Sequence, residues 1–90
     1  MITSFRNKPL RDFFETGKSA KIPADLRKRV ALWLDALDAA RKIEDLDQHG
    51  FRLHPLKPTT CWAIDVNGPW RITFEWIAGN ASAVDLEQYH

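Results

Sequence analysis

The alternation of apolar and polar residues in the last third of the chain is the feature that most constrains its fold. Apolar side chains occupy every second position of residues 62–66 and again of residues 70–76. This period of two is typical of a strand with one buried face. The sequence therefore predicts neighbouring strands that turn the same kind of face toward a core.

Turn signals separate these runs and predict how the strands connect. Asn67-Gly68 predicts a two-residue hairpin turn, and Pro69 would then begin the next strand, where its missing N–H does least harm. Gly79-Asn80 predicts a second turn, after which residues 82–86 pair back. The C-terminal part is thus expected to be an antiparallel meander of three or four strands.

The residues before the meander have helical period. Pro9 is expected to open a first helix that ends at Gly17. A second helix, with Pro23 in its first turn, carries one apolar stripe over residues 26–40. Residues 43–46 are expected to add a further helical turn, and residues 2–5 a short first strand. The predicted fold class is α+β, with both helices packed on one face of the C-terminal sheet.

Length and composition limit the class of protein. Ninety residues with 44% hydrophobic content predict one globular domain over residues 1–90. No apolar run approaches the length that spans a membrane, and the first residues lack the apolar segment of a signal peptide. The single cysteine, Cys61, cannot form an internal disulfide, so the cytoplasm is the expected compartment.

Charge is unevenly distributed, although the net charge is only +1. Residues 1–34 contain eight Lys or Arg residues and three acidic ones. Arg27, Lys28 and Arg29 lie near the start of the second predicted helix, where the helix dipole disfavours cations. We expect these three residues to bind RNA phosphates and to contribute little to fold stability. The alternative is an ordinary solvated helix face.

The segment Leu53-His54-Pro55-Leu56-Lys57 holds two candidate site residues. Leu53 and Leu56 are three positions apart, so in a regular strand their side chains would face opposite sides. Pro55 is therefore expected to mark a bulge or the end of a strand. His54 and Lys57 would then both face away from the core. The alternative is a surface histidine and a solvated lysine.

Three further candidates come later in the chain. Arg71 lies on the polar side of the best-defined strand, where it could hold a phosphate or pair with Glu75 or Asp85. Tyr89 and His90 form the C-terminal end, and chain ends usually fray. No metal site and no cofactor are expected, because the histidine and cysteine spacings do not match metal-ligand patterns.

Taken together, these motifs resemble a known family. Leu53-His54-Pro55-Leu56-Lys57, Trp70-Arg71-Ile72-Thr73-Phe74 and Tyr89-His90 occur in the order and spacing of the HigB toxins of the RelE/ParE superfamily. The resemblance runs from the first residue to the last. It implies the toxin of a type II toxin–antitoxin pair, which cleaves mRNA on the ribosome and is silenced by a HigA-like helix-turn-helix antitoxin.

The resemblance also implies roles for the candidate residues. RNA is cleaved when its 2′-OH attacks the adjacent phosphate, which requires a base, an acid and cations. His54 and His90 would transfer protons, and Tyr89 would orient or stack on the nucleotide. Lys57 and Arg71 would hold the scissile phosphate. Arg27, Lys28 and Arg29 would bind ribosomal RNA.

The chain departs from the family pattern at several positions. The loop Pro58-Thr59-Thr60-Cys61 is shorter than usual and uncharged, and Asn67, Pro69 and Gln88 replace residues that are common in the family. Two other functions therefore stay open. One is a toxin that acts by binding, as gyrase poisons of the ParE type do. The other is a weakly active toxin that is kept for antitoxin binding and operon repression.

Overall fold

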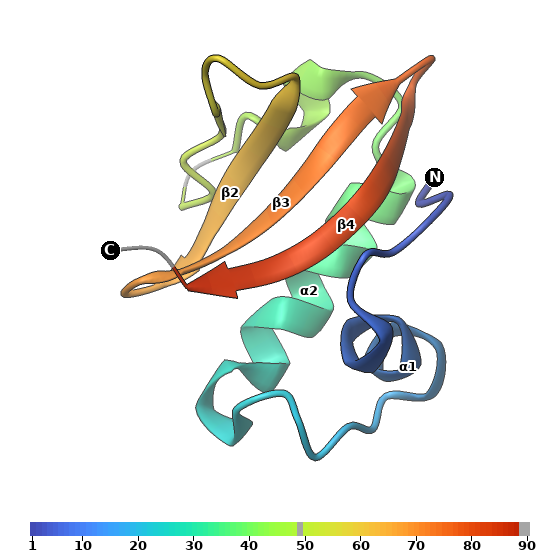
Figure 1. Ribbon diagram of the computed structural model, residues 1–90, viewed down its shortest axis with the longest axis vertical. Coiled ribbons are helices and arrows are strands. Elements are labelled where there is room, and N and C mark those ends of the chain that lie inside the picture. Colours follow the sequence, from blue (N-terminus) through green and yellow to red (C-terminus); the bar gives the residue numbers. More distant parts are fainter. Residues whose placement is uncertain (49, 89–90) are drawn as a thin grey trace.

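The computed structural model describes residues 1–48 and 50–88, which form two helices, two short 3₁₀ turns and four strands. The strands form one antiparallel sheet in the order β1-β2-β3-β4. Both helices lie on the same side of this sheet (Figure 1), which confirms the predicted α+β class. The bounds are α1 Lys8–Thr16, η1 Ala24–Leu26, α2 Arg27–Ala39, η2 Ile43–Leu46, β1 His54–Pro55, β2 Cys61–Asn67, β3 Trp70–Ile77 and β4 Asn80–Gln88.

The ends of α1 follow the signals in its sequence. Asn7 caps the N-terminus, because its side-chain oxygen accepts a hydrogen bond from the Leu10 N–H at 3.1 Å. Gly17 ends the helix in the left-handed conformation, with φ 77°, and donates its N–H to the Phe13 carbonyl. The second helical region begins with the 3₁₀ turn η1 after Pro23, and α2 itself begins at Arg27.

Both hairpin turns lie one residue away from their predicted positions. Asn67 pairs with Trp70, so the first turn is Gly68-Pro69 and not Asn67-Gly68. A bulge between Asp65 and Asn67 adds one residue to β2. Gly68 then takes the first turn position with φ 55°, and the fixed φ of proline suits the second.

The second turn is Ala78-Gly79 and not Gly79-Asn80, because Ile77 pairs with Asn80. Ala78 and Gly79 have φ of 52° and 80°. A type I′ turn requires two positive φ angles, and these two residues supply them. The strand β4 also extends further than predicted, to Gln88.

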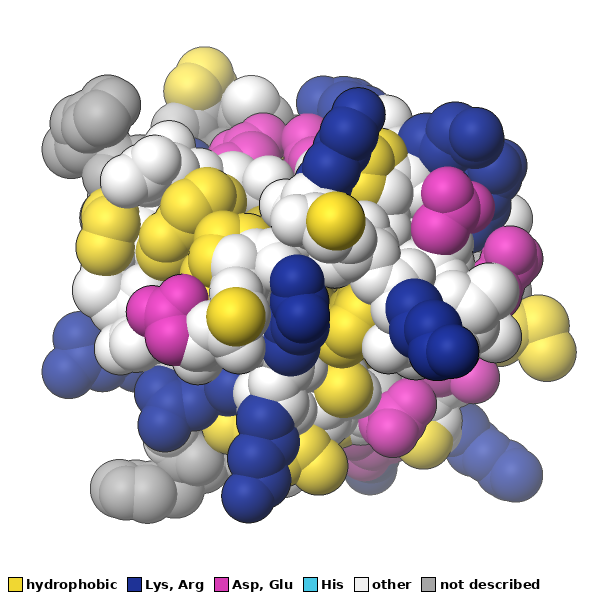
Figure 2. All heavy atoms as spheres, turned by 90° about the horizontal axis from the view of Figure 1, so that it is seen from below, with side chains coloured by type: hydrophobic (Ala, Val, Ile, Leu, Met, Phe, Trp, Pro, Cys, Tyr) yellow, Lys and Arg dark blue, Asp and Glu magenta, His cyan; other side chains and the backbone are white. Residues whose placement is uncertain are grey.

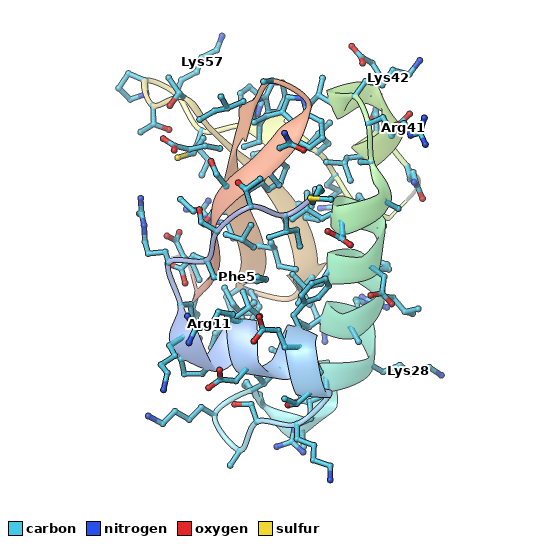
Figure 3. The ribbon with its side chains drawn as sticks, turned by 90° about the vertical axis from the view of Figure 1, so that its right-hand side faces the viewer. Phe5, Arg11, Lys28, Arg41, Lys42 and Lys57 are labelled. Atoms are coloured by element: carbon cyan, nitrogen blue, oxygen red, sulfur yellow. The ribbon has the colours of Figure 1, made fainter. Side chains whose placement is uncertain are left out.

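The N-terminal segment runs beside β4 in the parallel direction, through bridges from Ile2 to Ala81 and from Phe5 to Val84. The predicted first strand is therefore present as a short pairing that covers the outer edge of β4. Figure 1 shows the segment along β4, and Figure 3 shows Phe5 where this segment approaches α1. The ring of Phe5 lies 5.7 Å from that of Phe14 on α1.

The hydrophobic core lies between the helices and one face of the sheet. Leu34 and Leu37 of α2 pack with Ile64, Ile72 and Phe74 of the strands, and all five are at most 1% exposed. The alternation predicted for β2 and β3 is thus confirmed. The opposite face of the sheet carries no helix in the described residues. No described helix is both long enough and apolar enough to cross a membrane.

Candidate active site

The strand register aligns side chains across the helix-free face of the sheet, which we call the open face. His54 pairs with Ala63, Ala63 with Thr73 and Thr73 with Asp85. Directly opposed residues of antiparallel strands point to the same side of the sheet. His54 therefore lies on the open face, two strands from β3, as its sequence context predicted.

A hollow of about 380 Å³ lies on this open face. It brings together Lys57 and Arg71, which are 14 positions apart in the sequence, and adds the cation Arg6. One acidic residue, Glu87, also lines it. The full lining is Arg6, Leu56, Lys57, Thr59, Cys61, Arg71, Thr73, Ala83 and Glu87. Three cations around one carboxylate make this a surface that attracts an anion such as phosphate.

Arg71 is held within the hollow by neighbouring strands. Its Nη2 lies 3.6 Å from Oε2 of Glu87, its register partner on β4. The sequence left open a pair with Glu75 or Asp85, whereas in the structure Arg71 forms an ion pair with Glu87. Asp65 is the register partner of Arg71 on the other side, on β2. The side chain of Arg71 is 20% exposed, so its guanidinium can still meet a ligand from solvent.

Lys57 projects from the tight loop between β1 and β2. The Leu56 N–H donates to the Cys61 carbonyl at 2.9 Å, and the Thr59 N–H donates to the Leu56 carbonyl at 2.9 Å. The Thr59 hydroxyl also donates to the Leu56 carbonyl. Figure 3 shows the exposed Lys57 at the end of the molecule away from α1. The short loop thus presents an amine at the rim of the hollow.

His54 has a defined ring orientation. Its Nδ1 lies 2.6 Å from the Arg52 carbonyl. Because a carbonyl oxygen only accepts, the neutral ring carries its proton on Nδ1 and keeps a lone pair on Nε2. His54 is not among the described residues that line the hollow, although it lies on the same face. Tyr89 and His90 lie outside the described residues.

Arg27, Lys28 and Arg29 differ in their surroundings. Nε of the half-buried Arg27 donates to the Ile22 carbonyl at 2.9 Å. Nη1 of Arg29 donates to the Val66 carbonyl at 2.8 Å, and its guanidinium lies 5.6 Å from the centre of the Trp33 ring. The sequence analysis did not expect these contacts, which attach the side chains of Arg27 and Arg29 to the fold. Lys28 is exposed, as expected.

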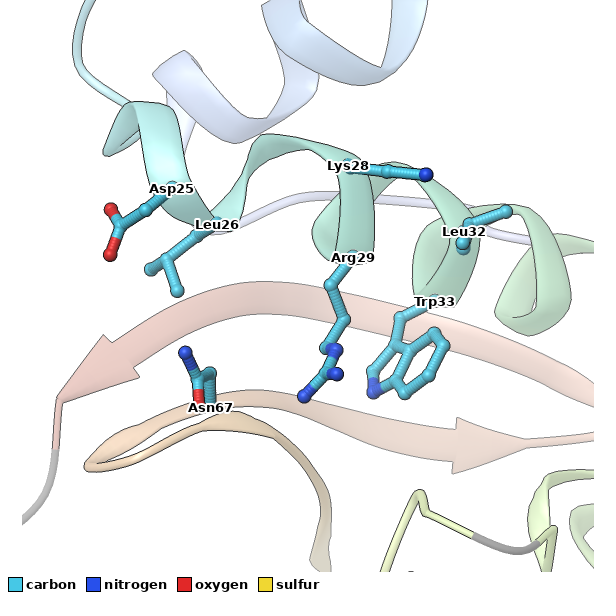
Figure 4. A pocket seen from close by; sticks show the side chains of 7 residues that line it. All are labelled: Asp25, Leu26, Lys28, Arg29, Leu32, Trp33 and Asn67. Atoms are coloured by element: carbon cyan, nitrogen blue, oxygen red, sulfur yellow. The ribbon is translucent and has the colours of Figure 1, made fainter.

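Arg29 and Lys28 line a second hollow, of about 410 Å³, between α2 and the β2–β3 hairpin. Figure 4 shows Arg29 and Trp33 pointing from α2 toward β2, while Lys28 points away. Figure 2 shows the end of the molecule that contains α1, where Lys and Arg side chains are spread among acidic ones. The exposed cations of residues 8–29 are Lys8, Arg11, Lys18, Lys21, Lys28 and Arg29.

Arg6 is the site residue that the sequence analysis missed. The available signal was its position directly after Phe5 in the predicted first strand, because alternate residues of a strand face opposite sides. Using that signal requires knowing that this strand lies beside β4, which local sequence patterns do not reveal.

Comparison with known proteins agrees with the resemblance seen in the motifs. Residues 3–90 match the family model of HigB-like toxins, described as RelE-like toxins of the type II toxin–antitoxin system HigB. The chain is also 40% identical over 92 aligned residues to Endoribonuclease HigB of Proteus vulgaris, with both proteins covered over their full length. The chain therefore belongs to the HigB-like family of RelE-like type II toxins.

Proposed function

We propose that this toxin is an mRNA endoribonuclease that acts on translated messages at the ribosome, in the cytoplasm. The observation that carries the proposal is the hollow that joins Lys57 and Arg71 on the face of the sheet that also holds His54. A relative that matches over its full length is named an endoribonuclease. A site for RNA cleavage needs cations at the phosphate and a group that titrates near neutral pH.

The chemistry follows from these groups. Arg71 and Lys57 bind the scissile phosphate and stabilise the negative charge that develops on it. The 2′-OH loses a proton and attacks the phosphorus, and the 5′-oxygen leaves as it gains a proton. Nε2 of His54 is suited to proton transfer, because the contact of Nδ1 with Arg52 leaves that lone pair available. We assign His90 as the second proton-transfer group and Tyr89 to orienting or stacking on the nucleotide.

A type II toxin has an antitoxin as its partner. We propose that this antitoxin is HigA-like and contains a helix-turn-helix domain. Arg27, Lys28 and Arg29 are proposed to contact ribosomal RNA, and Lys28 and Arg29 are the exposed ones of the three. Phosphate contacts of this kind add affinity without sequence preference and weaken as salt is raised.

Cleavage of a reporter mRNA by the purified chain tests the proposal. The mRNA is incubated with and without translating ribosomes, and the new 5′ ends are mapped by primer extension. We expect discrete cuts within the translated frame that require ribosomes, and loss of these cuts in His54→Ala. Intact mRNA would contradict the proposal, and gyrase-dependent DNA damage in its place would identify a toxin that acts by binding.

A further inference from the structure

The N-terminal segment is fixed against β4 at a bulge. Ser4 accepts hydrogen bonds from two consecutive N–H groups: Ala83 donates to its Oγ at 2.8 Å, and Val84 donates to its carbonyl at 3.1 Å. Ala83 has φ 51°, and the register of β4 against β3 shifts at this point. The Arg6 N–H then donates to the Val84 carbonyl at 2.9 Å. These contacts set the position of the Arg6 backbone.

The same pairing decides which way the Arg6 side chain points. Phe5 bridges to Val84 and packs against the core. The next residue of an extended segment points to the opposite side of the sheet. Arg6 is exposed and lines the open-face hollow with Lys57 and Arg71, in agreement with this direction.

A carboxylate on β4 close in sequence to Val84 accepts a hydrogen bond from its own strand. Asp85 follows Val84 on β4 and shares the open face with its register partner Thr73. Its Oδ1 accepts a hydrogen bond from the Leu86 N–H at 2.8 Å. Glu87, the acidic residue that lines the hollow, pairs with Arg71.

The spacing of the strands separates Arg6 from the proton-transfer residue. His54, Ala63, Thr73 and Asp85 form one row across the sheet, and Arg6 lies one segment beyond Asp85. Four interstrand spacings place the backbones of His54 and Arg6 about 19 Å apart. A single phosphodiester with its hydrogen bonds spans less than this distance. With His54 beside the scissile phosphate, this separation of the backbones places Arg6 toward the adjoining phosphate of a strand that crosses the sheet.

We propose that Arg6 forms a second phosphate-binding site, which holds the RNA phosphate next to the scissile one. The inference rests on the proposed function, because it requires an RNA strand lying across the open face. Arg71 and Lys57 hold the reacting phosphate, and the strand continues over β4 to Arg6. A guanidinium suits this role, because it can bind two phosphate oxygens at once.

Short RNA probes that cannot be cleaved test this site. Dinucleotides and trinucleotides with 2′-O-methyl groups present one and two internal phosphates, and their binding is measured by fluorescence anisotropy at several salt concentrations. We expect the wild-type chain to bind the two-phosphate probe more tightly. Arg6→Ala should lose this preference, and the slope of log K against log salt should become shallower by about 0.7, the value for one single-strand phosphate contact.

Matched variants distinguish the loss of the Arg6 charge from a disturbance of the fold. Arg11→Ala removes an exposed arginine of α1 that lies outside the hollow, and it should behave as wild type. Arg6→Lys should restore the salt slope, and Arg6→Gln should not. Because Arg6 and Arg11 are exposed and the bond from the Arg6 N–H to the Val84 carbonyl does not depend on the side chain, thermal melting should be the same in all four variants.

The inference is overturned if Arg6→Ala keeps the preference and slope of the wild-type chain, or if the wild-type chain itself shows no preference for two phosphates. Ribosomal cleavage by the same preparations identifies what has failed. A wild-type chain that cleaves mRNA but gains nothing from Arg6 refutes the second site alone. A wild-type chain that leaves mRNA intact refutes the proposed function as well.

Discussion

Arg71 and Glu87 face each other across β3 and β4, with Nη2 and Oε2 3.6 Å apart inside the open-face hollow. The pair places a negative charge beside the cation that we assign to the scissile phosphate. An incoming phosphate must therefore compete with the Glu87 carboxylate for the guanidinium. The side chains are 20% and 36% exposed, so solvent weakens the pair and permits this exchange.

Replacing Glu87 by glutamine should strengthen RNA binding a few-fold, because it removes a competing carboxylate and keeps the shape of the side chain. The free energy of unfolding should change by less than about 1 kcal/mol, as for other exposed ion pairs. Affinity for the 2′-O-methyl trinucleotide and thermal melting check both points. Glu15→Gln, at an exposed position on α1, is the matched control. Weaker RNA binding by Glu87→Gln would mean that Glu87 positions Arg71 and does not compete with phosphate.

Lys28 and Arg29 are adjacent in sequence but should respond differently to alanine. Lys28→Ala should weaken ribosome binding and leave the melting temperature unchanged, because this side chain is exposed. Arg29→Ala should also lower the free energy of unfolding by about 1–2 kcal/mol, because it loses the bond to Val66 and the contact with Trp33. Ribosome co-sedimentation and chemical denaturation measure the two effects. Equal decreases in the free energy of unfolding of Lys28→Ala and Arg29→Ala would contradict this prediction.

Asp45 should make stability depend on pH in the acid range. The Arg41 N–H donates to its carboxylate at 2.9 Å and the Lys42 N–H at 3.3 Å, and these bonds lower its pKa from the usual 3.8. Since the pKa is lower in the folded chain, the stabilisation is present above pH 3.8 and is lost as pH falls through the lowered pKa.

The test compares the melting temperatures of wild type and Asp45→Asn as pH is lowered. The variant should melt earlier near neutral pH, and the difference should shrink below pH 3.8. Asp47→Asn, at an exposed position, controls for the removal of a charge. A difference between wild type and Asp45→Asn that stays constant into acid would show that the carboxylate charge is not the cause.

Removing Tyr89 and His90 should abolish growth inhibition and leave the fold intact. Among the described residues, the last core residue of β4 is Leu86, and the truncation leaves it and the rest of β4 in place. Loss of a positioned proton-transfer group typically lowers a rate by about 10²–10⁴-fold. Growth after induction reports toxicity, with circular dichroism and antitoxin co-purification as folding controls. A folded truncation that still inhibits growth would exclude both residues from the site.

Helices and strands could be predicted from the sequence where a local apolar pattern was sufficient to identify them. The stripe over residues 26–40 predicted α2, and the alternation over residues 70–76 predicted β3 with its buried face. The turns were displaced by one residue, because the bulge before Asn67 and the positive φ of Ala78 are set by strand pairing. Favoured turn dipeptides alone do not contain that information.

The site could be predicted only in part, for the same reason. Lys57 and Arg71 were identified from motifs, and the fold brings them to one hollow. Arg6 was missed because it reaches that hollow through the parallel pairing of the N-terminal segment with β4. The structural contact of Arg29 was also missed, because its acceptor, the Val66 carbonyl, is 37 residues away in sequence.

Primer extension on a reporter mRNA after induction in cells tests the central claim most directly, with wild type compared to Arg71→Ala. Arg41→Ala, which removes an exposed arginine outside the hollow, is the control. The account predicts discrete cuts in translated frames with wild type and the control, and cuts at least about 10²-fold weaker with Arg71→Ala, since removing one donor that stabilises developing charge has such an effect. Undiminished cuts with Arg71→Ala, or intact mRNA with the wild-type toxin, would contradict it.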